Sequence, residues 1–138
     1  MTPQIWIVAL TLYGEAGNQG AHGIDLIAQV ISNRAERKGK TYSEVCLERK
    51  QFSYWNKNKD LNSTIEAFVN TPDYQTKSFL YCVEKAKNMP LADIRGTYYY
   101  YHTIKAHPSW SKKAISSRSF YQYGNHRFFT KAIIDGGN

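Results

Sequence analysis

The sequence has few of the features that mark several common protein classes. It holds only two cysteines among its 138 residues, too few for the disulfide framework of a small secreted scaffold. No segment approaches the roughly 20 apolar residues that a membrane-spanning helix needs, so we expect no stable membrane insertion. The apolar stretch 5–12 also lacks the basic start and small-residue cleavage site of a signal peptide. We therefore expect a chain made in the cytoplasm without a secretion signal of its own.

Acidic residues are scarce as well. The chain has 11 Asp and Glu against 18 Lys and Arg, which gives a net charge of +7. Such a charge favours polyanionic partners, namely nucleic acid, an anionic membrane or a cell wall rich in phosphate and carboxylate, and it is equally typical of a well-solvated surface. Aromatic residues, by contrast, are abundant: eleven Tyr, three Trp and six Phe exceed what a small core can bury. Several should therefore line a groove, where flat rings stack on sugars or bases.

Length and apolar spacing predict one mainly α domain of the α+β class over residues 1–138. The predicted elements are helices at 2–13, 24–38, 61–69 and 74–88, a short helix opened by the capping-box pair Thr41 and Glu44, and extended pieces at 98–103 and 120–130. The first extended piece should belong to a small β hairpin or irregular sheet. Cys46 and Cys82 fall at apolar helix positions, where buried free thiols are expected.

Glu15 is the sharpest candidate for chemistry. It lies where the first apolar helix meets a glycine-rich turn, so one side should face the core and the other an open cleft. A carboxyl group between apolar walls keeps its proton more readily than one in water, because a low dielectric disfavours the charged form. A general acid that protonates a glycosidic oxygen near neutral pH needs that state. From position alone, a glutamate that only hydrogen-bonds to backbone at a helix end remains an open alternative.

Four motif-like stretches follow one another along the chain. They are Tyr13-Gly14-Glu15-Ala16 with Gly20 and Asn33-Arg34; Gln51-Phe52-Ser53-Tyr54-Trp55-Asn56; Gly96-Thr97 through Tyr101-His102 with Pro108-x-Trp110; and Gly124-Asn125-His126-Arg127-Phe128-Phe129. In this order they resemble the cell-wall hydrolases typified by the spore-cortex-lytic enzyme (SleB-type). The last three look like that family's Gln-Phe-Ser-x-Trp, Gly-Ala-Thr-His-Tyr-His and Gly-Asn-His-x-Phe segments. The resemblance runs from about residue 8 to 129. Two departures are the tyrosine run 98–101, which replaces the family's first histidine, and Tyr54, which replaces a cysteine.

This resemblance implies a lysozyme-like or lytic-transglycosylase-like fold with one essential glutamate, matched here by Glu15. It also implies cleavage of the β-1,4 bond between N-acetylmuramic acid and N-acetylglucosamine in the glycan strands of peptidoglycan. Two-carboxylate glycosidases need a second acid about 5 to 9 Å from the first. No second acid lies in a recognisable motif, and Asp25, Glu44 and Asp60 fit helix starts or surfaces better. We therefore favour a single-acid route that ends in lytic transglycosylation, or in muramidase hydrolysis if water attacks. We expect the protein to need no metal or cofactor and to act as a monomer.

The other candidate site residues come from the same stretches. Ser53 is the second catalytic candidate, as a hydroxyl that orients Glu15 or a substrate N-acetyl group, and a serine that only satisfies loop backbone is the alternative. The substrate-binding candidates are Gln51, Trp55, Tyr101, His102, Trp110, Asn125 and His126. Their aromatic rings would stack on sugars unless they pack in the core. His126 is either a sugar contact, a support for Glu15 or a structural histidine.

Two other classes of protein remain open. A zinc-dependent N-acetylmuramoyl-L-alanine amidase would draw its ligands from His102, His107, His126 or a cysteine, although no His-Glu-x-x-His helix is present. A non-catalytic wall-binding or nucleic-acid-binding module would also explain basic charge with aromatics. No nucleic-acid-binding signature is present, so nucleic acid is not the expected partner. The favoured setting is a bacteriophage endolysin that reaches the periplasmic wall through a hole made by a holin, with a bacterial enzyme as the alternative.

Overall fold

The computed structural model describes residues 1–48, 52, 54–57, 60–91 and 93–135. The helices in that part are α1 (Pro3–Ala16), α2 (Gly20–Lys38), α3 (Tyr42–Cys46), α4 (Tyr54–Lys57), α5 (Leu61–Val69), α6 (Lys77–Asn88), α7 (Lys112–Ser116) and α8 (Lys131–Asp135). Short 3-10 turns are η1 (Pro72–Gln75), η2 (Met89–Leu91) and η3 (Ser109–Ser111), and the strands are β1 (Tyr98–Thr103), β2 (Tyr121–Tyr123) and β3 (His126–Thr130). The predicted class, mainly helical with a small β element, is confirmed.

The helices lie close to their predicted positions, with differences at their starts. Helix α2 begins at Gly20 instead of residue 24, since Gly23 packs closely against the side chain of Gln19 and continues the helix. Helix α6 begins at Lys77 instead of residue 74, because Thr76 caps it by accepting a hydrogen bond from the Phe79 amide at 3.1 Å. None of the described helices combines the length and the apolar character needed to cross a membrane.

The sheet has three antiparallel strands in the order β1-β3-β2, which agrees with the small β element predicted to include 98–103. The predicted extended piece 120–130 is itself a hairpin of β2 and β3, which turns at Gly124. Gly124 has φ 55°, a left-handed conformation that suits a residue without a Cβ atom. Pairing of β1 with β3 sets Tyr101 opposite Phe128 and His102 opposite Arg127.

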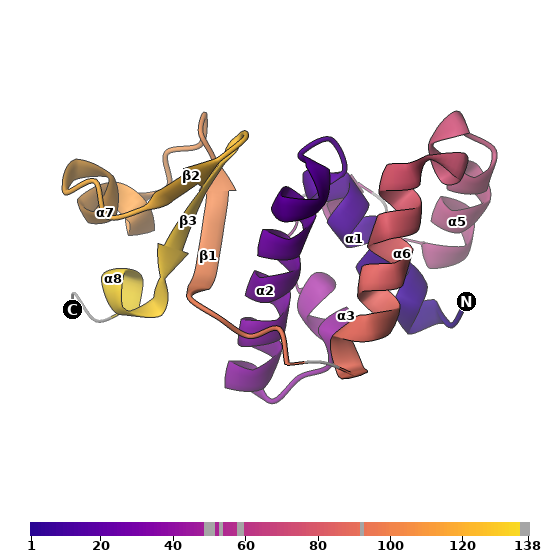
Figure 1. Cartoon of the computed structure of the whole chain (residues 1–138), viewed down its shortest axis with the longest axis horizontal. Helices are drawn as coiled ribbons and strands as arrows, with labels where there is room; N and C mark the ends of the chain where they lie inside the picture. Colours follow the sequence, from indigo (N-terminus) through magenta and orange to yellow (C-terminus); the bar gives the residue numbers. More distant parts are fainter. Residues whose placement is uncertain (49–51, 53, 58–59, 92, 136–138) are drawn as a thin grey trace.

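The hydrophobic core lies between α1, α2, α3 and α6, and α2 also packs on β1. Figure 1 shows α1, α3, α5 and α6 on one side of α2 and the sheet on the other side, with α7 and α8 beyond the sheet. Cys46 and Cys82 are buried and free, as predicted. Burial raises the pKa of each thiol to about 12, so both stay protonated and behave as apolar groups.

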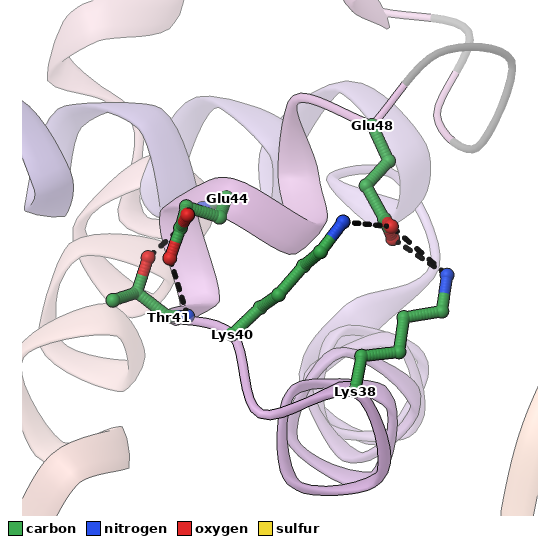
Figure 2. Close-up of polar contacts among 5 residues, drawn as sticks. All are labelled: Lys38, Lys40, Thr41, Glu44 and Glu48. Carbon is green, nitrogen blue, oxygen red and sulfur yellow. Dashed lines mark hydrogen bonds and ion pairs between the residues drawn. The ribbon is translucent and has the colours of Figure 1, made fainter.

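The corner between α2 and α3 is held by charged groups (Figure 2). The predicted capping box is present: the Thr41 hydroxyl accepts from the Glu44 amide at 3.1 Å, and the Glu44 carboxylate accepts from the Thr41 amide at 2.9 Å. Glu48 accepts from the ammonium groups of Lys38 and Lys40. Burial alone would raise the pKa of Glu48, but these hydrogen bonds outweigh it and lower the pKa. The corner fixes α3 beside α2, and α3 also packs on α1.

Candidate active site

Glu15 lies in the last turn of α1 and is partly buried. One turn earlier on the same face, Thr11 is fully buried and donates its hydroxyl proton to the carbonyl oxygen of Ile7 at 2.7 Å. The indole Nε1 of Trp55, on α4, donates to the Thr11 hydroxyl at 2.7 Å. This bond anchors α4 to α1 directly beneath Glu15, and so brings one predicted sugar-binding ring into the neighbourhood of the carboxyl group.

Tyr101 is the side chain that the structure places directly on Glu15. Its phenol donates a hydrogen bond to Glu15 Oε1 at 2.5 Å, across 86 positions of sequence. The ring packs among Phe52, Phe128 and His126, with ring centroids 5.3 to 6.1 Å away. Burial, and then the negative charge of Glu15 and the hydrogen bond to it, raise the pKa of Tyr101 well above its usual range. The phenol therefore stays protonated and acts as a fixed donor toward the carboxyl group.

His126, on β3, completes this group. Its ring meets the Tyr101 ring edge-on at 5.3 Å. Burial lowers the pKa of His126, so its imidazole is neutral near pH 7. Glu15, Tyr101 and His126 thus form one group from α1, β1 and β3, and Trp55 of α4 is linked to the same helix through Thr11. A partly buried carboxyl group with a permanent donor on one oxygen is suited to general acid and base chemistry on a sugar.

A profile of the family described as Cell Wall Hydrolase matches residues 18–129. The chain belongs to the cell wall hydrolase family. Peptidoglycan is accordingly its substrate. The match covers Trp55, Tyr101 and His126 and begins three residues after Glu15, whose candidacy therefore depends on the sequence motif and on the contacts just described. No curated protein and no solved structure matches the chain.

Close packing of α4 against α1 in this cell wall hydrolase depends on Gly14, the neighbour of Glu15. A Cβ atom at this position would overlap the ring of Tyr54 on α4. Tyr54 in turn meets the Trp55 ring edge-on at 5.1 Å. The glycine in the Tyr-Gly-Glu-Ala motif therefore has a packing reason: it lets α4 approach the residue on which the candidate chemistry depends.

Replacing Gly14 by alanine should push α4 away from Glu15 and lower turnover by tenfold or more, at a cost of about 1–3 kcal/mol in the free energy of unfolding. Gly39→Ala is the matched control, because Gly39 has φ 62° and open space around it. That change should cost about 1 kcal/mol and leave turnover intact. Urea unfolding and initial rates on purified walls measure both effects. Equal turnover in the two variants would show that the approach of α4 does not matter.

Asn33 is a site-supporting residue for which sequence analysis gave no role beyond its place in the motif. This buried side chain on α2 donates to the carbonyl oxygens of Gly96 (3.1 Å) and Tyr98 (2.7 Å) and accepts from the Gly96 amide at 3.2 Å. Gln29, one turn earlier, accepts from the Tyr98 amide at 2.9 Å. These bonds hold the start of β1 on α2 and so fix how far Tyr101 reaches toward Glu15.

The Asn33→Ala variant should lose about 1–3 kcal/mol in free energy of unfolding, because it removes the hydrogen bonds that the buried Asn33 amide makes with the backbone of Gly96 and Tyr98. Asn88→Ala is the control, since Asn88 is exposed at the end of α6 and should change stability by less than about 0.5 kcal/mol. Urea denaturation followed by circular dichroism measures both. A loss below about 1 kcal/mol for Asn33→Ala would refute the proposed clamp.

The remaining predicted substrate contacts lie elsewhere. His102 projects from the opposite face of β1 to Tyr101, as alternation along a strand requires, and packs 5.3 Å from the Trp110 ring. Trp110 is 42% exposed, so it can still meet a ligand, but on the side of η3. Asn125 is exposed at the hairpin tip, where its backbone N–H donates to the side-chain oxygen of Gln19 at 3.0 Å. Gln51 and Ser53 lie outside the described residues.

Two hollows are relevant to the position of a ligand. One of about 410 Å³ is lined by Thr103, Ile104, Lys105 and Asn125, at the hairpin tip that Gln19 contacts. A larger one of about 640 Å³ lies between α2, α3 and η2 and contains none of the candidate residues. The chemistry of the described side chains, and not hollow size, therefore decides which region is the candidate site.

The zinc alternative needs a cluster of metal-binding side chains. Among the described residues, no three His, Cys, Asp or Glu side chains are grouped so that they could hold a metal ion. His102 uses both ring nitrogens within the fold: Nδ1 lies 2.7 Å from the Thr103 carbonyl oxygen and Nε2 lies 2.9 Å from the Ser111 hydroxyl. Burial lowers its pKa, so this ring is also neutral near pH 7.

Proposed function

We propose that this cell wall hydrolase is a peptidoglycan glycosidase, with residues 1–138 as one catalytic domain and Glu15 as its general acid and base. The bond cleaved is the β-1,4 linkage between N-acetylmuramic acid and N-acetylglucosamine. The observation that carries the proposal is the 2.5 Å hydrogen bond from the protonated phenol of Tyr101 to the Glu15 carboxyl group. A zinc amidase or a passive binding module has no need of such a pair.

In the first half of the reaction, Glu15 donates its proton to the glycosidic oxygen as the bond to the anomeric carbon breaks. The acetamido group of the substrate helps to stabilise the positive charge that develops there. Glu15 becomes a carboxylate in this step, and the Tyr101 phenol already points at it. A donor fixed in advance on a group that gains negative charge stabilises the transition state more than the ground state. Tyr101 therefore has a role besides sugar stacking.

In the second half, the Glu15 carboxylate takes the proton of the muramic acid 6-hydroxyl, whose oxygen attacks the anomeric carbon. This leaves a 1,6-anhydro end and restores the protonated acid. The contacts of Asp25, Glu44 and Asp60 support the single-acid route: Asp25 accepts from Tyr81 and pairs with Lys85, and the other two cap helices. If water attacks in place of the 6-hydroxyl, the same residues make a muramidase.

An end-group assay tests this proposal. Purified peptidoglycan digested by the protein should lose turbidity without gaining free alanine amino groups, since glycan bonds and not amide bonds are cut. Prior treatment with EDTA should leave the rate unchanged. Release of amino groups, or loss of activity with EDTA and recovery with zinc, would favour the amidase and contradict the proposal.

The biological setting we propose is host lysis by a phage endolysin that a holin releases to the wall. The support is the cell wall as target, which the family shows, and a basic chain suited to an anionic envelope. Expression inside a bacterium should then be harmless until the membrane is opened by a holin or by chloroform, and should cause rapid lysis afterwards. Lysis at the same rate without membrane opening would refute this role.

A further inference from the structure

The positive charge of the chain is concentrated near its C-terminal end. Residues 97–138 contain one acidic residue, Asp135, and six basic ones: Lys105, Lys112, Lys113, Arg118, Arg127 and Lys131. Their net charge is +5. Residues 1–96 contain the other twelve basic and ten acidic residues, a net charge of +2. We call residues 97–135, the described part of the C-terminal region, the basic lobe. It comprises the sheet, η3, α7 and α8.

Among the described residues, the six basic side chains of the lobe have no acidic partner. Five of the six basic side chains belong to exposed residues, and Arg127 is partly buried over the Phe120 ring at 4.8 Å. Within the described part of the chain, none of the six lies within 4.0 Å of an acidic oxygen, whereas basic residues elsewhere do form ion pairs, as at Lys38 and Arg95. Asp135 is engaged by Arg37 of α2. The lobe therefore presents an uncompensated positive surface.

The distribution of the charges indicates what kind of anion they suit. A small anion needs donors that converge on one point, but these side chains are spread over α7, β3, α8 and the loops that follow β1 and α7. An extended polymer with repeated negative groups can meet them one after another. Trp110 and Tyr121 are exposed in the same lobe, at 42% and 37%, and add apolar contact area. Figure 1 shows α7 and α8 on the side of the sheet away from α2.

We propose that the basic lobe binds the phosphate groups of an anionic polymer attached to the same wall as the glycan substrate. Strand β1 belongs to the lobe and also carries Tyr101, which contacts Glu15. A polymer held on the lobe would therefore keep neighbouring glycan at high effective concentration near the carboxyl group. The proposal rests on the wall as target, which the family shows, and not on the chemistry assigned to Glu15.

The test compares two double charge reversals in a Glu15→Gln background, which should bind walls without degrading them. Lys112→Glu/Lys113→Glu changes exposed residues of α7, and Lys77→Glu/Lys87→Glu changes exposed residues of α6. Each pair lowers the net charge by four.

Co-sedimentation with insoluble walls should show binding about tenfold weaker for the α7 pair and less than twofold weaker for the α6 pair. Added salt should reduce the difference in wall binding between the two pairs, because it screens the charges. After hydrofluoric acid strips the phosphate polymers, all proteins should bind alike.

Three results would overturn the proposal. Equal losses in the two pairs would mean that only net charge matters. If the α7 pair still binds more weakly than the α6 pair after the phosphate polymers are removed, the surface binds stem-peptide carboxylates instead. If the two pairs differ in binding to phosphatidylglycerol vesicles but not to walls, the surface binds membrane. Lys112→Gln/Lys113→Gln, with an intermediate loss expected, covers the case in which the reversal fails to fold. With Glu15 intact, the Lys112→Glu/Lys113→Glu variant should cleave soluble, phosphate-free glycan at a rate within twofold of the wild type. If the wild type itself does not cleave that glycan, the result counts against the proposed glycosidase activity and not against the proposed binding surface.

Discussion

Glu15→Gln is expected to lower the turnover of peptidoglycan by about a thousandfold, within the range that loss of general acid–base catalysis costs. The amide has nearly the shape of the carboxyl group and can still accept the Tyr101 hydrogen bond, but it has no acidic proton to give. Initial rates of turbidity loss on purified walls measure the effect. Binding to walls and the thermal unfolding temperature should stay close to those of the wild type.

The matched control for this change is Glu66→Gln. Glu66 is exposed on α5, away from the candidate site, and the same chemical change there should leave the rate within twofold. A Glu15→Gln protein that keeps a tenth or more of wild-type turnover would show that another group supplies the proton. A loss of turnover accompanied by unfolding would instead count against the isosteric design of the variant, and Glu15→Asp would then replace it as the probe.

Tyr101→Phe should produce the second largest effect. It removes only the phenol oxygen and leaves the ring between Phe52, Phe128 and His126. A hydrogen bond to a charged group contributes about 1.5–3 kcal/mol, which corresponds to a fall in kcat of about 10- to 100-fold. KM should change little, because the donor acts on the carboxylate formed in the transition state and not on bound glycan.

This variant separates donation from stacking, the role that sequence analysis gave to Tyr101. If the ring only stacked on sugar, phenylalanine would serve as well and kcat would be retained. Tyr99→Phe is the control on the same strand, where removal of a phenol oxygen should change kcat by less than twofold. A similar fall in both variants, or a rise in KM alone for Tyr101→Phe, would remove Tyr101 from the proposed mechanism.

Local patterns were enough to predict most of the fold. The apolar face of 2–13 predicted a helix that delivers Glu15 to its end, and the helix extends only one turn further, to Ala16. Strand-forming residues predicted β1 with its observed bounds, Tyr98–Thr103. The turn that divides the predicted extended piece 120–130 into β2 and β3 was not predicted, although glycine followed by a polar residue, as at Gly124 and Asn125, is a common turn signal.

The contact between Tyr101 and Glu15 could not have been predicted from local patterns. Four consecutive tyrosines at 98–101 alternate between the two faces of β1, and only the register with β3 decides which one faces α1. The same register sends His102 to the other face, where it packs with Trp110. Long-range pairing fixes both outcomes, and a single sequence without related ones does not reveal it.

Two supporting residues did carry a local signal. Thr11 lies four positions before Glu15, and Asn33 lies on α2 between the buried apolar residues Ile31 and Ala35, so both are polar side chains at positions that a helix buries. A buried polar side chain needs a partner, and such a residue near a candidate carboxyl group is a reason to look for one. Their partners, Trp55 and the start of β1, become evident only in the folded chain.

Mass spectrometry of the fragments released from purified peptidoglycan tests the central claim most directly. A single carboxyl group that first gives and then takes a proton should leave glycan fragments ending in 1,6-anhydro-muramic acid, and Glu15→Gln should abolish them. Fragments with reducing muramic acid ends would contradict the intramolecular route. Freed stem peptides beside intact glycan strands would contradict the glycosidase itself.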